Sequence, residues 1–397
     1  MMTGKVAIME GSRAVAEAIR ACQPDVISAY PISPQTHIVE YLASYVASGK
    51  LQSKYIRADS EFSAASILAG ASAAGARTYT ASSSQGLLLM TEVIFNIAST
   101  RLPVVLTTVN RAVSAPITIQ PDHQDSMTLR DPGIIQIHVE SIQEAYDTHI
   151  QAFRIAEDKE IMLPIMVCMD GWILSHSFEV VTMLPDDEIS AFVGNFKPEQ
   201  RLDIKKPLTY GAYADEDRLM EYRYTLMVAQ QKAKGKIEEI ATEFRQTFGR
   251  CSGGLIDSYR CEDADILFMA MGSLVSTIRV VVDEMRNEGH KVGLVKVRSY
   301  RPFPTEAIRL SCQNAKAIAV IDKSISINIG GILATEVKSA YYHQPKRPRI
   351  ISFLAGLGGK EVNRLSLRQM HAQSLQICKQ DVWIDEPIFV GLNKDIL

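Results

Sequence analysis

Residues 55–111 read YIRADSEFSAASILAGASAAGARTYTASSSQGLLLMTEVIFNIASTRLPVVLTTVNR, and this stretch decides the fold. It predicts a short strand at 55–57, a helix that opens on Glu61, a strand at 78–82, a second helix and an apolar strand at 104–108. The first helix is nearly all Ala, Ser and Gly, so it can pack very close to its neighbours. Arg111 follows the last strand, at the edge where open α/β sheets bind their ligands.

Two polar turns mark the same expected edge. Residues 83–86 read SSQG, and we expect their backbone amides to lie just ahead of a helix that begins at Leu87. Residues 29–35 read AYPISPQ, in which two prolines stiffen the link between a strand and a helix. This turn leaves the hydroxyl of Ser33 at the carboxyl edge of the sheet.

Strand and helix alternate on both sides of this stretch. Further predicted strands are KVAIME at 5–10, DVISAY at 25–30, IIQIHVE at 134–140 and LPIMVCMD at 163–170. Strands that alternate with helices of ten or more residues predict an α/β fold with a doubly wound parallel sheet, which we assign to a domain at 1–195. Residues 112–133 form a loop that is too long and too polar to be only a connector, so we expect it to be functional.

The pattern changes after residue 195. Residues 196–258 are predicted as a linker with a long helix at 215–248, where apolar residues recur at helical spacing. These are Leu226, Ala229, Ala233, Ile237, Ile240, Phe244 and Phe248. Alternation then resumes, with one strand predicted over KVGLVKVRSY at 291–300, and residues 259–397 are predicted as a second, smaller α/β domain.

Composition narrows the class of protein. The chain has 397 residues, of which 47% are hydrophobic and 22% charged, so it has room for two or more packed domains. A net charge of −3 provides no attraction for nucleic acid or an anionic membrane. No apolar run approaches the roughly 20 residues that span a bilayer, so we expect a cytoplasmic protein.

No metal or cluster site is predicted in this chain. Its six cysteines contain no CxxC pair, so zinc and iron–sulfur sites lack their usual spacing. Its eight histidines show no HxxxH spacing, which leaves a zinc hydrolase without support. Any redox cluster must therefore lie on another chain.

Each candidate residue also has a purely structural interpretation. A carboxylate at a helix start, such as Glu61, is stabilised by the helix dipole by about 0.3–1 kcal/mol, and this alone explains it. Its functional alternative is a hydrogen bond to a heterocyclic nitrogen of a cofactor. Arg111 either pairs with a nearby acid or binds a substrate carboxylate with its planar fork, and the long loop after it favours the second. Ser33 is at least as well explained as a helix cap.

Seven motifs, taken together, resemble the alpha subunit of the 2-oxoacid:ferredoxin oxidoreductases, most closely the pyruvate branch. They are AYPISPQ (29–35), ADSEFSAASILAGASAAGART (58–78), TASSSQGL (80–87), TTVNR (107–111), DGWILSH (170–176), RPFP (301–304) and AGLGG (355–359). Their order and spacing match across almost the whole chain. No single motif is specific, whereas the combination is.

This resemblance implies a thiamine-diphosphate enzyme in which the present chain supplies the pyrimidine-binding domain and a domain similar to the transketolase C-terminal one. The diphosphate and its Mg²⁺ would lie on a beta subunit, and the [4Fe–4S] clusters on partner chains beside gamma and ferredoxin-like delta subunits. Oxidative decarboxylation of a 2-oxo acid would yield an acyl-CoA and CO₂, with coenzyme A as co-substrate. Ferredoxin, or NAD through a flavin subunit, would accept the electrons.

The resemblance also implies residue roles. Glu61 matches the glutamate that hydrogen-bonds the aminopyrimidine ring and favours the tautomer that deprotonates the thiazolium carbon. Arg111 matches the arginine that grips the carboxylate of the 2-oxo acid, and Ser33 stands where threonine is usual. Further residues expected at the cofactor are Pro31, Ser84 and Gln85.

Two departures from the family pattern concern the substrate. Gln120 and Pro121 stand where the pyruvate branch usually has a bulkier aromatic residue, and Ser33 removes a methyl group relative to threonine. We therefore hypothesise a larger acid, such as phenylglyoxylate, which binds beside Gln120. Oxalate is disfavoured, because a small dianion calls for a second cation.

Two other classes compete with this interpretation. One is a non-catalytic α/β scaffold or binding subunit, against which the retention of Glu61, Arg111 and Ser33 argues. The other is a transketolase-like, non-redox thiamine enzyme, against which the missing diphosphate half argues, because the chain has no GDG followed by a metal-binding Asn.

Overall fold

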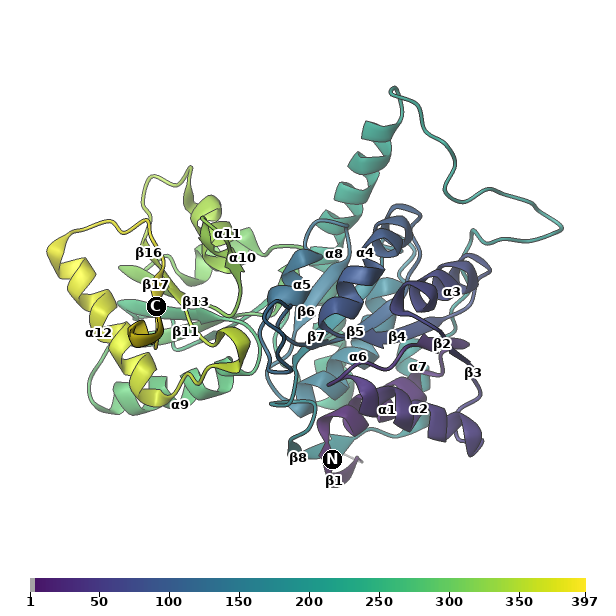
Figure 1. Ribbon diagram of the computed structural model, residues 1–397, viewed down its shortest axis with the longest axis horizontal. Helices are drawn as coiled ribbons and strands as arrows, with labels where there is room; N and C mark the ends of the chain where they lie inside the picture. The colour runs from purple at the N-terminus through teal and green to yellow at the C-terminus, as the bar shows by residue number, and fades with distance from the viewer. Residues whose placement is uncertain (1–3) are drawn as a thin grey trace.

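The computed structural model describes residues 4–397 as two α/β sheets with their helices (Figure 1). The long helix α8 (Leu219–Phe248) packs on helices of the first sheet. The first sheet has seven strands. Their order is β12 (Ser299–Arg301), β6 (Ile135–His138), β7 (Ile165–Asp170), β5 (Val105–Asn110), β4 (Thr78–Ser82), β2 (Val26–Ala29) and β3 (Lys54–Arg57). All neighbours pair in parallel except β12 with β6. The prediction of a doubly wound α/β sheet is confirmed.

The strand order reverses at β2. From β2 the chain passes to β3 on one side of it and then to β4 on the other side. In open parallel sheets, the connections that leave such a point diverge and open a crevice at the carboxyl ends of the strands, where ligands bind. The segments after β2 and β4 are the two polar turns that contain Ser33 and Ser84.

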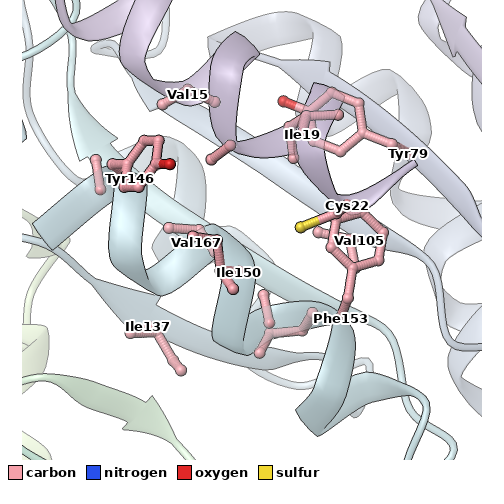
Figure 2. Close-up of a cluster of buried hydrophobic side chains, with 14 of the residues drawn as sticks. Val15, Ile19, Cys22, Tyr79, Val105, Ile137, Tyr146, Ile150, Phe153 and Val167 are labelled. Atoms are coloured by element: carbon pink, nitrogen blue, oxygen red, sulfur yellow. The ribbon is translucent and has the colours of Figure 1, made fainter. Parts of the chain in front are cut away.

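Helices cover both faces of the first sheet. They are α1 (Gly11–Cys22), α2 (Thr36–Ala47), α3 (Glu61–Ala73), α4 (Ser84–Ser99), α6 (Ile142–Ala156) and α7 (Asp186–Val193). Alternate residues of β5 point to opposite faces, so Val105 packs with α1 and α6 (Figure 2), whereas Leu106 packs with α3 and α4. This two-sided burial explains why β7 (IMVCMD) is almost continuously apolar.

The second sheet has six strands. Their order is β17 (Ile388–Phe389), β16 (Arg349–Leu354), β13 (Ala317–Asp322), β10 (Ile266–Ala270), β11 (Val292–Val297) and β9 (Ile256–Tyr259). Its helices are α9 (Leu274–Asn287), α10 (Thr305–Ser311), α11 (Ile332–Tyr341) and α12 (Arg364–Gln380). A small hairpin of β14 (Ile325–Ser326) and β15 (Gly330–Gly331) precedes α11.

Five details differ from the sequence-based prediction. The strand predicted at 5–10 is β1 (Lys5–Glu10), which pairs antiparallel with β8 (Phe178–Met183) outside the main sheet. Helix α4 begins at Ser84 rather than Leu87, so the polar turn is its first turn, and the predicted loop contains the short helix α5 (Gln124–Thr128). The long helix begins at Leu219, four residues after its predicted start at Asp215.

The fifth difference concerns the stretch at 291–300, which was predicted as one strand. It divides at Arg298: β11 lies in the second sheet, and β12 joins the first. Arg298 is buried between the two sheets and pairs with Glu144 of α6 at 3.0 Å. That ion pair fixes the chain where it leaves one sheet for the other, which strand propensity alone cannot reveal.

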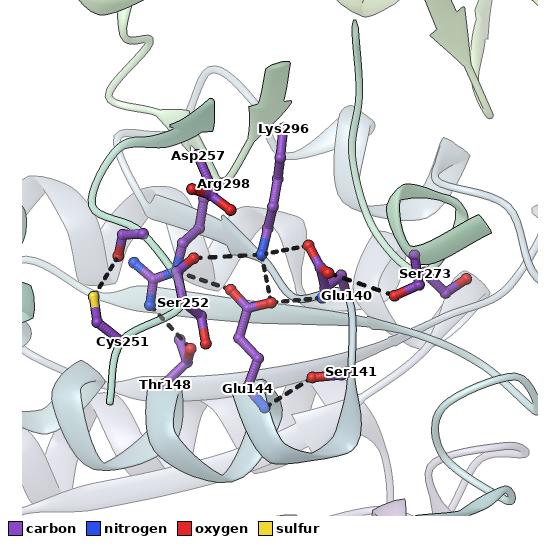
Figure 3. A network of polar contacts seen from close by, with 12 residues as sticks. Glu140, Ser141, Glu144, Thr148, Cys251, Ser252, Asp257, Ser273, Lys296 and Arg298 are labelled. Carbon is purple, nitrogen blue, oxygen red and sulfur yellow. Dashed lines mark hydrogen bonds and ion pairs between the residues drawn. The ribbon is translucent and has the colours of Figure 1, made fainter. Parts of the chain in front are cut away.

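A buried ionic network joins the two halves at this point (Figure 3). Lys296 of β11 contacts Glu144 at 2.6 Å and Glu140 at 3.0 Å. Arg298 also donates to Thr148 Oγ1 at 3.0 Å. Within residues 4–397, no helix combines the length and apolar character needed to cross a membrane.

Candidate active site

Glu61 is the first residue of α3, and Ser60 caps this helix by accepting a hydrogen bond from the Ser63 amide. The Glu61 side chain is buried, with 6% of the residue exposed, yet its carboxylate has no hydrogen-bond or ion-pair partner in the described part of the chain. It lies against Gly86 in the first turn of α4: a Cβ atom at Gly86 would lie only 2.6 Å from Glu61 Oε1. A buried carboxylate without a partner is costly, so this one is suited to a donor on a bound molecule.

Arg111 follows β5 and is also buried, with 7% exposed. Its guanidinium donates to the Thr118 carbonyl at 3.0 Å, the Ser33 carbonyl at 2.8 Å and Gln85 Oε1 at 3.2 Å. A guanidinium carries five N–H groups, so one remains on each terminal nitrogen. No carboxylate pairs with this arginine within residues 4–397. Its positive charge is therefore available to an anionic ligand.

Ser84 and Gln85 precede Gly86 in the first turn of α4, and Gln85 contacts Arg111. Ser84 Oγ lies 2.7 Å from the Ala112 carbonyl and 2.6 Å from Gln85 Oε1, the same oxygen that accepts from Arg111. The structure thus brings together Glu61, Ser84, Gln85, Arg111 and the Ser33 turn. The Ser33 side chain is exposed, as is Pro31 in the same turn.

Asp125 organises the site, and sequence reasoning missed it. This fully buried carboxylate in α5 accepts hydrogen bonds from the amides of Ser84 at 3.0 Å and Arg111 at 2.9 Å, and from Asn110 Nδ2 at 2.7 Å. Burial raises its pKa to about 7, although the N–H donors around it favour the ionised form. An acid inside the polar loop after Arg111 was the only signal available in the sequence.

The second half of the chain covers the far side of this loop. Asp122 accepts a hydrogen bond from the Gly358 amide at 3.0 Å, and the His123 amide donates to the Lys323 carbonyl at 2.8 Å. Gln120 is exposed, and its Cβ faces Gly359 of the AGLGG turn. The polar loop is therefore held between the two sheets.

Asp170, at the end of β7, anchors the same junction. It contacts His123 Nε2 at 2.8 Å and Lys323 Nζ at 3.1 Å. Burial opposes ionisation of this carboxyl group, but Lys323 and His123 together hold its pKa well below the usual range. These partners come from segments far apart in the sequence, so spacing could not predict them.

The residues present fit the pyrimidine half of a thiamine-type cofactor. Glu61 offers an unpaired buried carboxylate to a ring nitrogen, and Gly86 leaves open the space beside it that any side chain would fill. Arg111 contacts Gln85 and offers its guanidinium to a carboxylate-bearing substrate. The described residues of this site include no cluster of oxygen ligands for a diphosphate-bound metal.

Comparison with known proteins places these features in a family. Residues 17–242 match the thiamine-diphosphate-binding domain of pyruvate flavodoxin/ferredoxin oxidoreductases, and residues 264–366 match core domain II of pyruvate:ferredoxin oxidoreductase. Over 395 residues, the chain is 49% identical to the pyruvate synthase subunit PorA of Methanosarcina barkeri, covering 99% of this chain and 98% of that one. The corresponding subunit of Thermotoga maritima is 43% identical over 97% of both chains.

Two further relatives show the breadth of the family. The ketoisovalerate oxidoreductase subunit VorA of Pyrococcus horikoshii is 41% identical over 355 residues, which cover 89% of this chain and 90% of that one. A solved 2-oxoglutarate:ferredoxin oxidoreductase of Magnetococcus marinus shares the fold, with a TM-score of 0.69 at 18% identity over 94% of this chain. The present chain spans 66% of that longer chain.

Proposed function

The chain belongs to the 2-oxoacid:ferredoxin oxidoreductases as an alpha subunit of the pyruvate type, and from this premise we propose that it carries half of a split active site for oxidative decarboxylation of a 2-oxo acid. The proposed half lies at the carboxyl ends of β2, β4 and β5. Its residues would bind the aminopyrimidine ring and the substrate carboxylate.

The observation that carries this proposal is the buried guanidinium of Arg111, which no carboxylate in the described chain neutralises. A 2-oxo acid brings one carboxylate, and the N–H left on each terminal nitrogen matches its two oxygens. Holding that carboxylate orients the adjacent carbonyl group for attack and for loss of CO₂.

Glu61 would hold the cofactor. Its carboxylate would accept a hydrogen bond from the pyrimidine ring, and Ser84 with Gln85 would line the same turn. Bound thiamine diphosphate would supply the nucleophilic carbon and the electron sink for decarboxylation. The close approach of α4 to α3 at Gly86 would hold this carboxylate in place beside the ring.

The remaining components follow as part of the same proposal. A beta subunit would bind the diphosphate with Mg²⁺, and gamma and ferredoxin-like delta subunits would complete a complex whose [4Fe–4S] clusters pass electrons to ferredoxin. Coenzyme A would accept the acyl group. The pyruvate synthase subunits among the relatives support pyruvate as the substrate, and the ketoisovalerate subunit supports tolerance of a branched acid. Phenylglyoxylate is the alternative substrate, for which the site would be wider beside Gln120.

The test is anaerobic reduction of a viologen dye by the complex purified through this chain, with coenzyme A. Pyruvate, 2-oxoisovalerate, 2-oxoglutarate, phenylglyoxylate and oxalate are compared by kcat/KM. The highest value for pyruvate supports the proposal, and the highest value for phenylglyoxylate would support the larger acid. A complex that reduces dye with none of them, although it contains thiamine diphosphate, would contradict a 2-oxo acid as substrate. A complex without the cofactor would indicate the scaffold alternative.

A further inference from the structure

Three side chains with metal-binding atoms meet outside the active-site crevice. Glu10 ends β1, His37 lies in the first turn of α2, and His176 follows β7 in the DGWILSH turn. One potential ligand atom from each lies within 4.8 Å of the other two. We propose that Glu10, His37 and His176 form a site for one divalent transition-metal ion of the zinc class, independent of the 2-oxo acid chemistry.

The backbone holds two of these residues in place before any ion binds. The Gly11 amide donates to the Ser177 carbonyl at 3.1 Å, and the Ser12 amide donates to the Ser175 carbonyl at 2.9 Å. The start of α1, beside Glu10, is therefore fastened to the turn that carries His176. Such preorganisation reduces the entropy lost when an ion orders its ligands.

The third ligand, His37, is held in place through Gln35, which lies in the same turn as Ser33. Gln35 is buried and donates from Nε2 to the Ala81 carbonyl at 2.7 Å, which fixes the start of α2 against β4. His37 Nδ1 lies 2.6 Å from Glu10 Oε1, and the His37 and His176 rings are 4.5 Å apart between centroids. Atoms bound to one tetrahedral zinc at about 2 Å lie about 3.3 Å apart. The close His37–Glu10 contact would open slightly, and the longer separations would close by side-chain rotation.

The ligand types select the class of ion. Two imidazoles and one carboxylate form a set that suits Zn²⁺ and similar ions, with a fourth position left to water. Mg²⁺ and Ca²⁺ require oxygen ligands, so this set is unsuited to the metal of a diphosphate.

Neighbouring side chains form hydrogen bonds with the proposed ligands and orient them. Tyr41 donates to Glu10 Oε2 at 3.0 Å, which leaves Oε1 for the ion. Ser175 Oγ lies 2.7 Å from His176 Nδ1, so Nε2 is the ring nitrogen of His176 without a partner among the described residues. Second contacts of this kind fix the tautomer and the ring orientation of a ligating histidine.

The site is also connected to the loop that carries Gln120. The Trp172 indole lies on the His176 ring, with 4.2 Å between centroids, and its Nε1 donates to the Ile119 carbonyl at 2.7 Å. An ion that immobilises His176 would therefore also restrain Trp172 and the end of this loop. Metal binding is thus expected to protect the backbone amides of residues 117–120 from hydrogen exchange.

The experiment uses the full chain expressed alone, stripped with a chelator and free of iron–sulfur partners. Zn²⁺ binding is measured by equilibrium dialysis, and Co²⁺ binding by its visible spectrum. The wild type should bind one Zn²⁺, and it should show Co²⁺ bands of a low-coordinate site without thiolate charge transfer, which excludes the six cysteines as ligands. His37→Gln and His176→Gln should each weaken Zn²⁺ binding by at least about 10-fold, because changes to outer partners alone cost about 10- to 100-fold.

The controls distinguish a metal site from an ion pair. His343→Gln changes an exposed histidine outside the cluster and should bind Zn²⁺ like the wild type. The His37 side chain is 43% exposed, so His37→Gln should melt with the wild type in chelator, and only the wild type should gain Tm when Zn²⁺ is added. Tyr41→Phe should weaken binding about 10-fold without loss of fold. Equal Zn²⁺ affinity in wild type and His37→Gln, or no saturable binding by the wild type, would overturn the proposal.

Discussion

Arg111 carries the sharpest prediction at the scale of a single residue. Replacing it with Ala removes a charged hydrogen-bond donor pair worth about 1.5–3 kcal/mol, so kcat/KM should fall by more than about 10-fold with a raised KM. Arg111→Lys keeps the charge but loses the planar fork, so it should recover only part of this loss. Steady-state kinetics of the complex with pyruvate measure both variants.

Arg201→Ala is the matched control for this prediction, because Arg201 is exposed and distant in sequence from the crevice turns. Its kcat/KM should equal that of the wild type. Arg111→Ala with unchanged kcat/KM would assign this arginine to holding the carbonyls of Ser33 and Thr118 rather than to binding substrate.

Asp125 predicts a pH dependence. Its pKa is raised to about 7, and only the ionised carboxylate accepts all of the N–H groups that hold Ser84 and Arg111. Protonation as the pH falls below about 7 should therefore loosen the site and lower kcat/KM. Asp125→Asn has one acceptor oxygen at every pH, so its kcat/KM should be low and should lack this acid limb. If kcat/KM of this variant falls at the same acidic pH as in the wild type, a group other than Asp125 causes the fall.

A residue could be proposed from the sequence through its position beside a regular element, but not through its partners. Arg111 and Glu61 were proposed as site residues because each borders a strand or helix with a clear hydrophobic pattern. Asp125 and Asp170 owe their roles to contacts across 14 to 153 residues of sequence, as in the bond from Asp125 to Arg111 and the pair of Asp170 with Lys323. Such contacts leave no local pattern, and the same holds for the cluster of Glu10, His37 and His176.

At the scale of elements, Gly86 sets the distance between α3 and α4. A Cβ there would meet Glu61 Oε1 at 2.6 Å and Ser82 Oγ at 2.5 Å. Gly86→Ala should therefore displace the Glu61 carboxylate and lower kcat by about 100-fold, as a misplacement of about 1 Å can do. Dye-reduction kinetics together with thermal unfolding measure the effect.

Gly70, inside α3, provides the matched control. A Cβ at this position meets nothing within 4 Å, so Gly70→Ala should leave kcat unchanged and stabilise the helix by about 0.5–1 kcal/mol. If Gly86→Ala retains full activity, the close approach of the two helices at this glycine has no part in positioning Glu61.

The boundaries of elements followed the strength of their patterns. The strand at 78–82 was predicted to the residue, because an alternating β-rich run lies between clear helices. The start of α4 was placed three residues late, since SSQG also fits a turn, and helix ends are the least defined part of any pattern. β8 was missed, because its partner β1 draws both strands away from the parallel sheet.

At the scale of the whole molecule, the network around Glu144 joins the two halves. Arg298→Met should leave Glu144 under-compensated in the interior and lower the free energy of unfolding by about 3–5 kcal/mol. Arg364→Met breaks an exposed pair with Glu284 and should cost about 0–1 kcal/mol. Urea unfolding of the full chain measures both values.

The double variant Glu144→Gln/Arg298→Met tests the physical cause. Removing both charges leaves less unpaired charge in the interior, so part of the lost stability should return. The loss in free energy of unfolding of the double variant is compared with the summed losses of the two single variants. If the double variant loses more than this sum, the network stabilises the molecule through packing rather than through charge compensation.

β12 pairs in the first sheet although it lies in the second half of the sequence, and this has a consequence for synthesis on the ribosome. The first sheet receives its last strand, Ser299–Arg301, only after most of the chain has been translated. Until then, β6 presents an unpaired edge, and such edges recruit other strands in nascent or crowded chains. The N-terminal half should therefore depend on a chaperone or on continued translation, and chains truncated before residue 299 should aggregate.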